Sequence, residues 1–207
     1  EHYQILEPLA YLLGINEILL NDNRHWYWEW ELQMRPWLQP TIYYYLVVIF
    51  KTIGINNSFD WTFLIRLLSS LLGFCSLVYL FKTVKELFFK ENNHFNYLLF
   101  FTFWFYPFLH SRTSSENLSL TLFIFAFCFL FNQIINSNTK NNLFLNFLLG
   151  LLLGFSLVIR FNLIFTILPI FVWIIFFRFN FYKLLPIFLG VITSLIIGLV
   201  IDSINYN

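Results

Sequence analysis

The sequence predicts an all-α integral membrane protein, built as a multi-pass helical bundle. Two features of the composition indicate this class: 59% of the 207 residues are hydrophobic and only 11% are charged. An ordinary soluble domain has about 45–50% apolar and about 25% charged residues. The third feature is the length of the apolar stretches, because a helix needs roughly 17–25 mostly apolar residues to cross a bilayer. Transmembrane strands would alternate apolar and polar residues instead.

Six transmembrane helices are expected, one from each long apolar stretch. The first carries Arg66 near its start, where a long side chain can reach the interface. The other five contain no charged residue. In chain order, the expected helices are 64–81, 94–110, 117–134, 142–159, 161–177 and 184–201. They form a predicted transmembrane bundle of residues 64–207, which follows a loop region of residues 1–63.

The connecting segments differ in charge between the two sides of this bundle. The short loops of one side carry the basic residues Lys82, Lys85, Lys90, Lys140, Arg178 and Lys183, with Glu86 and Glu91 as their acids. Short loops rich in Lys and Arg stay in the cytoplasm. Residues 1–63 and Asp202 are therefore expected on the other side. That side is the lumen in an endoplasmic reticulum membrane, if the protein is eukaryotic, and the periplasm in a bacterial inner membrane.

The loop region is expected to lie along the membrane surface. Residues 1–13 separate polar and apolar side chains onto two faces of a helix, as an interfacial helix does. Pro8 is expected to kink or divide this helix, and Gly14 to end it. The tryptophans that follow are concentrated as in an interfacial aromatic belt. They are Trp26, Trp28, Trp30 and Trp37.

Residues 40–55 form a short apolar stretch that contains Lys51. If this stretch crossed the membrane, the first short loop would move to the acidic side and invert the charge bias. A juxtamembrane or re-entrant helix is therefore expected here.

Two arginines indicate where chemistry could take place. Arg112 lies in a polar cluster between two apolar stretches, and Arg160 separates two expected spans that have no visible loop between them. An arginine at such a depth is costly unless it pairs with an acid, a carbonyl or a phosphate. With the acids of the same side, these arginines suggest a site where a lipid-linked phosphate meets a carboxylate that acts as general base. The alternative is a structural pair of Arg112 with Glu116, four residues later.

Other kinds of site are not indicated. The net charge of +1, without a basic block, speaks against nucleic acid as a partner. The four histidines, His2, His25, His94 and His110, are scattered, and no paired motif for a metal and no Gly-rich phosphate loop occurs. Cys75 and Cys128 lie inside apolar runs and are expected to be small buried hydrophobes.

Four short segments follow one another in an order that resembles a known family. Glu1-His2-Tyr3-Gln4-Ile5-Leu6-Glu7-Pro8 resembles a His-Pro-Asp-Glu-x-x-Gln-x-x-Glu stretch. Trp28-Glu29-Trp30 with Arg35-Pro36-Trp37-Leu38-Gln39-Pro40 is similar to a Trp-Glu-Trp and Arg-Ser-x-x-Tyr-Pro segment. Arg112-Thr113 with Asn117, displaced by one position, is similar to Arg-Thr-x-x-Asn, and Asp202-Ser203 resembles Asp-Ser-x-x-Tyr. The family is that of the Alg9-like and GPI mannosyltransferases, glycosyltransferase family 22.

The resemblance implies a multi-pass glycosyltransferase of the GT-C type. Such an enzyme transfers a sugar, here mannose-like, from a polyprenyl- or dolichyl-phosphate donor to a lipid-linked or glycan acceptor, with inversion at the anomeric carbon. The implied partners are membrane lipid, the lipid-linked donor and the acceptor. No cofactor is implied, and no metal ligand is assigned.

The resemblance also implies roles for individual residues. The catalytic base of the family is an Asp that would lie just before Glu1, so we expect a fragment that lacks the first transmembrane helix and this Asp. Glu1 is then the catalytic candidate that neighbours the base. Candidates for substrate binding are Gln4, Glu7, Glu29, Arg35, Arg112, Glu116 and Asp202.

Three alternatives stay open at this point. A GT-C enzyme for another sugar would have the same motifs. A transporter or flippase would favour interrupted helices in two related halves, whereas Pro107, Pro169 and Pro186 form no such pairing. A non-catalytic membrane subunit would keep sugar transfer unchanged when the candidate residues are replaced.

Overall fold

The computed structural model describes residues 2–14, 33–88, 112–135, 143–177 and 181–206, and every regular element in these ranges is helical. The predicted all-α class is confirmed. In chain order the helices are α1 (His2–Leu12), α4 (Leu38–Thr52), α5 (Ser58–Phe88), α8 (Ser115–Ile135), α9 (Leu143–Ile159), the 3-10 turn η1 (Phe161–Leu163), α10 (Ile164–Phe177) and α11 (Phe181–Tyr206).

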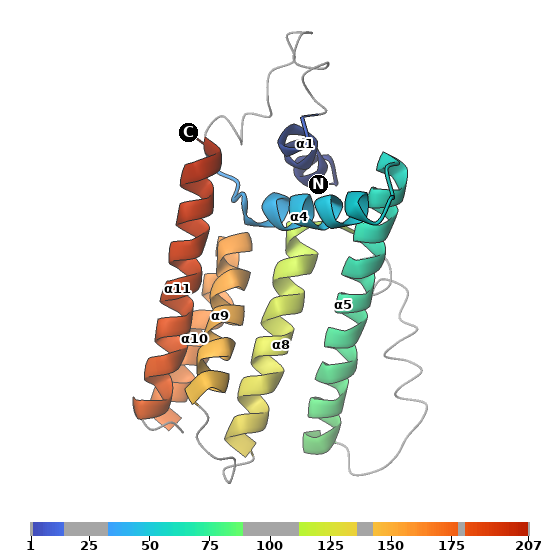
Figure 1. The fold of residues 1–207 in the computed structure, drawn as a ribbon. Helices are drawn as coiled ribbons and strands as arrows, with labels where there is room; N and C mark the ends of the chain where they lie inside the picture. The colour runs from blue at the N-terminus through green and yellow to red at the C-terminus, as the bar shows by residue number, and fades with distance from the viewer. Residues whose placement is uncertain (1, 15–32, 89–111, 136–142, 178–180, 207) are drawn as a thin grey trace.

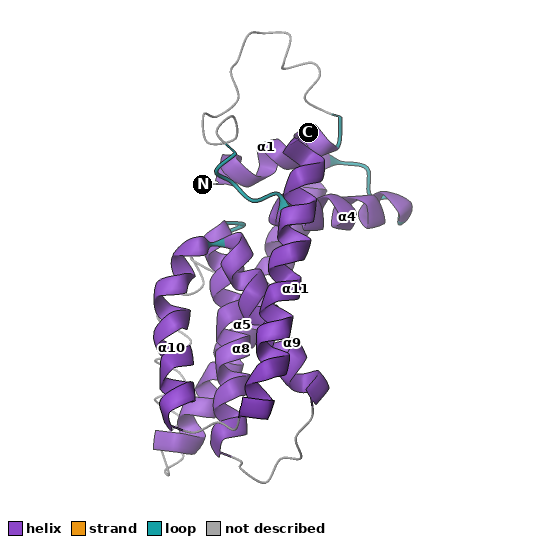
Figure 2. Cartoon of the chain, turned by 90° about the vertical axis from the view of Figure 1, so that its left-hand side faces the viewer, coloured by secondary structure: helices purple, strands orange, loops and turns teal. Residues whose placement is uncertain are grey.

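The helices form a bundle with a cap across one end. The bundle helices have roughly aligned axes; they are α5, α8, α9, α10 and α11. Helix α4 lies across their ends, and α1 lies beyond α4 (Figure 1 and Figure 2). The first turns of α5, α8 and α10 and the last turns of α9 and α11 lie at this end of the bundle, where α5 and α11 extend past α4 (Figure 1). We call this part of the molecule the capped end.

Three helices are long and apolar enough to cross a membrane: Ser58–Lys85, Ser115–Gln133 and Leu184–Tyr206. The first and third contain the predicted spans 64–81 and 184–201, and the second contains the predicted span 117–134 except for its last residue. The shorter apolar helices Leu143–Ile159 and Phe161–Val172 correspond to the predictions 142–159 and 161–177, and the expected helix 94–110 lies outside the described residues. The chain is thus a multi-pass membrane protein.

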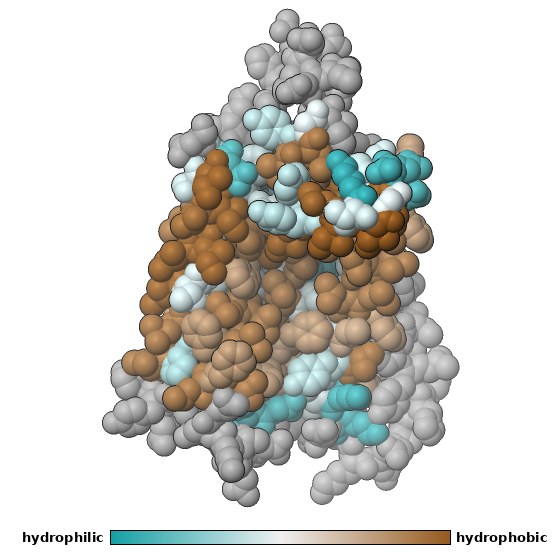
Figure 3. Space-filling model, viewed as in Figure 1, coloured by the Kyte–Doolittle hydropathy of each residue, from teal (hydrophilic) through white to brown (hydrophobic). Residues whose placement is uncertain are grey.

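The outer face of the bundle is apolar along most of its length. Exposed Leu71, Leu72, Phe188, Leu189 and Ile196 contribute to it, and hydrophobic residues dominate the middle of the molecule in Figure 3, with hydrophilic ones toward both ends. Such a surface belongs in lipid. One prediction fails for the same reason: Cys128 is buried, but Cys75 is exposed, since an apolar run in a membrane helix faces lipid as well as the core.

Small residues let α9 and α11 approach each other closely. Gly150 and Gly154 of α9 face Gly190 and Ser194 of α11: a Cβ added at Gly150 would overlap the carbonyl oxygen of Ile187 and lie 3.0 Å from the Cα of Gly190. Small residues four apart are a common way for membrane helices to pack backbone against backbone. Beside this contact, Leu149, Leu153 and Ile187 belong to a buried cluster together with residues of α8 and α10.

The cap is held by a second cluster, which joins α1, α4 and α5. Its buried members are Ile5, Leu9, Tyr43, Val47, Trp61 and Ile65. A polar chain runs through it: Gln39 Nε2 donates to Tyr43 Oη at 2.9 Å, and Tyr43 Oη lies 3.4 Å from Ser69 Oγ. These hydrogen bonds connect α4 to α5. Lys51 of α4 makes a second contact with α5, since its Nζ lies 4.9 Å from the centre of the Trp61 ring.

The first helix differs in one respect from the expectation. α1 includes Pro8 and continues to Leu12, so Pro8 does not start a second helix. Pro8 is fully buried, and its ring removes a single helix hydrogen bond. Gly14 follows the end of the helix with a φ of +70°, which confirms the predicted stop because glycine adopts this conformation without strain.

Candidate functional site

The described candidate residues lie at the capped end. Glu7 belongs to α1, and Arg35 precedes α4. Arg112 precedes α8, Glu116 lies in the first turn of α8, and Asp202 is in the last turns of α11. Glu1 and Glu29 lie outside the described residues, as does the side chain of Gln4. Residues that are far apart in the sequence are thus brought to one end of the bundle.

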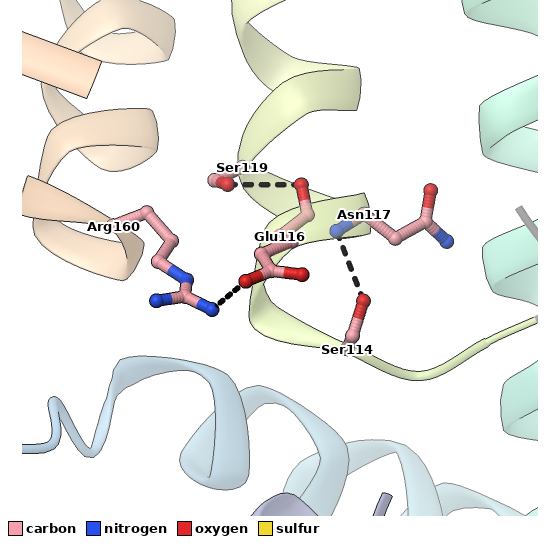
Figure 4. Close-up of polar contacts among 5 residues, drawn as sticks. All are labelled: Ser114, Glu116, Asn117, Ser119 and Arg160. Atoms are coloured by element: carbon pink, nitrogen blue, oxygen red, sulfur yellow. Dashed lines mark hydrogen bonds and ion pairs between the residues drawn. The ribbon is translucent and has the colours of Figure 1, made fainter. Parts of the chain in front are cut away.

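An ion pair joins two helices at this end. Arg160 follows α9 in an extended conformation (φ −143°, ψ 98°) and precedes η1. Its Nη2 pairs with Glu116 Oε1 in the first turn of α8. Figure 4 shows the guanidinium of Arg160 directed at this carboxylate. The side chain of Arg160 is 23% exposed and that of Glu116 is 55% exposed, so the pair lies at the edge of the protein interior.

The guanidinium of Arg160 has hydrogen-bonding capacity left. Its Nε is buried and has no hydrogen-bond partner among the described residues. A buried donor without a partner is unfavourable by about 1–3 kcal/mol. Arg160 therefore has both a charge and a free donor to offer to an anionic group.

The segment before α8 is fixed by local hydrogen bonds. Ser114 Oγ accepts from the backbone N–H of Asn117 at 3.2 Å, which is the geometry of an N-cap. Asn117 Nδ2 donates to the carbonyl oxygen of Arg112 at 2.9 Å, and Asn117 is only 7% exposed. The residues that resemble the Arg-Thr-x-x-Asn stretch thus shape the turn that presents Glu116 to Arg160.

Asp202 contacts the segment that leads into α4. Its Oδ1 accepts the backbone N–H of Trp37 at 2.7 Å, and Tyr206 Oη donates to the carbonyl oxygen of Arg35. The Trp37 ring lies edge-on to Tyr206, with centroids 5.7 Å apart, and 6.3 Å from the ring of Tyr11 in α1. Trp37 and Tyr206 were absent from the sequence-based candidates, although Tyr206 follows Asp202 by four residues and so shares its helix face.

Glu7 is expected to make the stability of the protein depend on pH. Partial burial disfavours its charged form and raises the pKa of Glu7 above the ordinary 4.5. The folded state therefore binds this proton more tightly than the unfolded state, and the free energy of unfolding falls as the pH rises from the ordinary pKa through the raised one. Thermal unfolding in detergent over this range should show a weaker pH dependence for Glu7→Gln than for the wild type. Equal slopes would contradict the assignment.

Within the described part of the chain, no group of three or more His, Cys, Asp or Glu side chains could hold a metal ion. The described charged groups of the capped end include arginines, Lys51 and single carboxylates. Such groups suit a ligand that carries both phosphate and hydroxyl groups.

The comparison with known protein families gives one result. Residues 1–207 match the Alg9-like mannosyltransferase family. No curated protein and no solved structure matches the chain.

Proposed function

Because the chain belongs to the Alg9-like mannosyltransferase family, we propose that it transfers a mannose-like sugar from a polyprenyl- or dolichyl-phosphate donor to a lipid-linked or glycan acceptor. The observation that carries this proposal is the gathering of its charged candidates at the capped end. The Arg160–Glu116 pair lies there together with Arg35, Arg112 and Asp202. A polar end on an apolar bundle is the place where a lipid-linked substrate can keep its chain in the membrane and its sugar phosphate at the surface.

Arg160 is the residue that we assign to the donor phosphate. In the reaction, the acceptor oxygen forms a bond to the anomeric carbon, the bond from that carbon to the phosphate oxygen breaks, and the acceptor proton passes to a carboxylate. Negative charge then develops on the departing lipid phosphate. A guanidinium stabilises such charge through its fork of donors. Arg160 combines a charge with a buried Nε that has no partner in the described part of the chain.

Glu116 orients Arg160 in this proposal, and Glu7 contacts the acceptor. The ion pair fixes one nitrogen of the guanidinium, and the other nitrogens are proposed to contact the phosphate. Glu7 is an exposed carboxyl group on α1, and such a group can form a hydrogen bond with a sugar hydroxyl. Arg35 and Arg112 complete the positive charge near the donor.

The capped end is proposed to face the non-cytoplasmic side of the membrane. Lys82 and Lys85 lie near the far end of α5, away from the cap. Basic residues that follow a span favour the cytoplasm. The cap and the donor sugar would then lie in the lumen of the endoplasmic reticulum in a eukaryote, or in the periplasm in a bacterium.

The test is a transfer assay with the complete protein in sealed membrane vesicles. Polyprenyl-phosphate mannose, the same lipid phosphate with glucose, and nucleotide-linked mannose are offered as radiolabelled donors with a crude lipid-linked acceptor. Label should pass from the lipid-phosphate mannose, and Glu116→Gln should reduce the rate. Asp60→Asn, an exposed acid at the same end but outside the proposed site, should not. Transfer from the glucose lipid alone would change the assigned sugar, and no transfer from any lipid-linked sugar would overturn the proposal.

A further inference from the structure

We propose that Asp202 and Tyr206 form a clasp that holds residues 35–37 against the end of α11, and that both act as positioning residues without touching the substrate. The activity readout of this inference rests on the sugar transfer proposed above. The clasp itself is defined by contacts between two segments that lie 165 or more residues apart in the chain.

The spacing of the two residues suits this role. Residues four apart on an α-helix lie on the same face, about 6 Å apart along the axis. Asp202 and Tyr206 therefore reach the same short segment, one at Trp37 and the other at Arg35. The resemblance to an Asp-Ser-x-x-Tyr stretch thus has a structural explanation in this chain.

Asp202 supplies a cap that α4 does not have within itself. Trp37 is the N-cap residue of α4 and makes no side-chain cap hydrogen bond, yet its carbonyl accepts the first helical N–H, from Thr41, at 2.9 Å. The first N–H groups of a helix lack partners inside the helix, and a negative charge is favourable near them. The carboxylate of Asp202, which comes from another helix, accepts the N–H of Trp37 at 2.7 Å.

Tyr206 extends the clasp to α1. Its hydroxyl donates to Arg35, and its ring packs edge-on against Trp37, which is 2% exposed. Trp37 in turn contacts Tyr11 of α1. Tyr11 and Glu7 are four residues apart and share a face of α1, so the clasp links the end of α11 to two proposed substrate contacts, Arg35 and Glu7.

The chemistry of the clasp differs from that of a direct contact. To accept a backbone N–H, Asp202 needs an oxygen at the right place but no charge, and the amide oxygen of asparagine can supply it. Binding of a cation, transfer of a proton or charge balance at a phosphate would need the carboxylate. Asp202→Asn and Asp202→Ala therefore separate the two roles.

The first measurement is the kinetics of sugar transfer with the complete protein in membranes. Asp202→Ala should lower kcat/KM by about tenfold or more, mainly through a higher KM, because the partly buried N–H of Trp37 loses its acceptor. Asp202→Asn should stay within about threefold of the wild type, and Tyr206→Phe, which keeps the ring, should lie between them. Asn205→Ala is the matched control, since among the described residues Asn205 Nδ2 bonds within α11, to the carbonyl oxygen of Ile201 at 2.8 Å. If Asp202→Asn loses as much activity as Asp202→Ala, the proposal is overturned.

The second measurement does not depend on activity. Hydrogen–deuterium exchange of the peptide that contains Trp37 should be faster in Asp202→Ala than in the wild type, and close to the wild type in Asp202→Asn and Asn205→Ala. Unchanged exchange in Asp202→Ala would overturn the clasp even if transfer is affected. If the wild type transfers no sugar but exchange follows the expected pattern, the clasp stands and the proposed function fails.

Discussion

Replacing Arg160 by alanine is expected to reduce sugar transfer by roughly 10²–10³-fold, the range seen when a positioned donor to developing negative charge is removed. The reason is that the departing lipid phosphate loses the guanidinium assigned to it. The stability of the protein should change much less, by about 1 kcal/mol or less, because the ion pair with Glu116 is partly exposed. Transfer rates and thermal unfolding of the same purified variant measure the two effects.

A double-mutant cycle with Glu116 provides the control for this result. Glu116→Ala removes the orienting carboxylate but leaves the charge of Arg160 for the phosphate, so its loss of transfer should be smaller than that of Arg160→Ala. The double variant should resemble Arg160→Ala. If both single variants and the double variant lose the same activity, the two residues act only as a structural pair, and the assignment of Arg160 to the phosphate is wrong.

A methyl group added at Gly190 is expected to destabilise the bundle by about 1–3 kcal/mol. The new Cβ would overlap the carbonyl oxygen of Phe147 and lie 2.8 Å from the backbone nitrogen of Leu151. Backbone atoms cannot rotate away, so α9 and α11 must move apart. Alanine is otherwise about 1 kcal/mol more favourable than glycine inside a helix, which means that a loss of stability can only come from the helix contact. Unfolding in detergent, followed by circular dichroism, measures it.

Gly198 offers a matched control on the same helix. A Cβ there would meet side-chain atoms of Val158, with the nearest at 2.6 Å. A side chain can shift where a backbone cannot, so Gly198→Ala should destabilise less than Gly190→Ala. Equal effects of the two substitutions would show that close backbone contact is not what sets the stability of this helix pair.

The fold class and most described spans could be predicted from the sequence because they depend on local composition. An apolar stretch of sufficient length has to be helical in lipid, where every backbone polar group needs an internal partner. This argument led to 117–134 and 184–201, and the structure places long apolar helices there. The end of the first helix near Gly14 could be predicted for the same reason, since it depends on the backbone conformation of one glycine.

The partners of the polar residues could not be predicted in the same way. From the sequence, Glu116 was paired with Arg112, four residues earlier, but the ion pair that the structure gives it is with Arg160, which follows α9. The contact between Asp202 and Trp37 spans 165 residues. A periodic pattern reports which residues share a face of one helix, but not which other helix lies opposite that face.

The sequence by itself determined that this chain is a helical membrane protein, and its short motifs indicated the mannosyltransferase family that the comparison then confirmed. Tertiary structure alone decided that Gly150 and Gly190 bring α9 and α11 into backbone contact, and that Asp202 reaches the start of α4. The physical reason is the range of the interactions. Transfer of apolar residues into lipid acts on each segment separately, whereas hydrogen bonds and close packing act only between groups that the fold has already brought within a few ångströms.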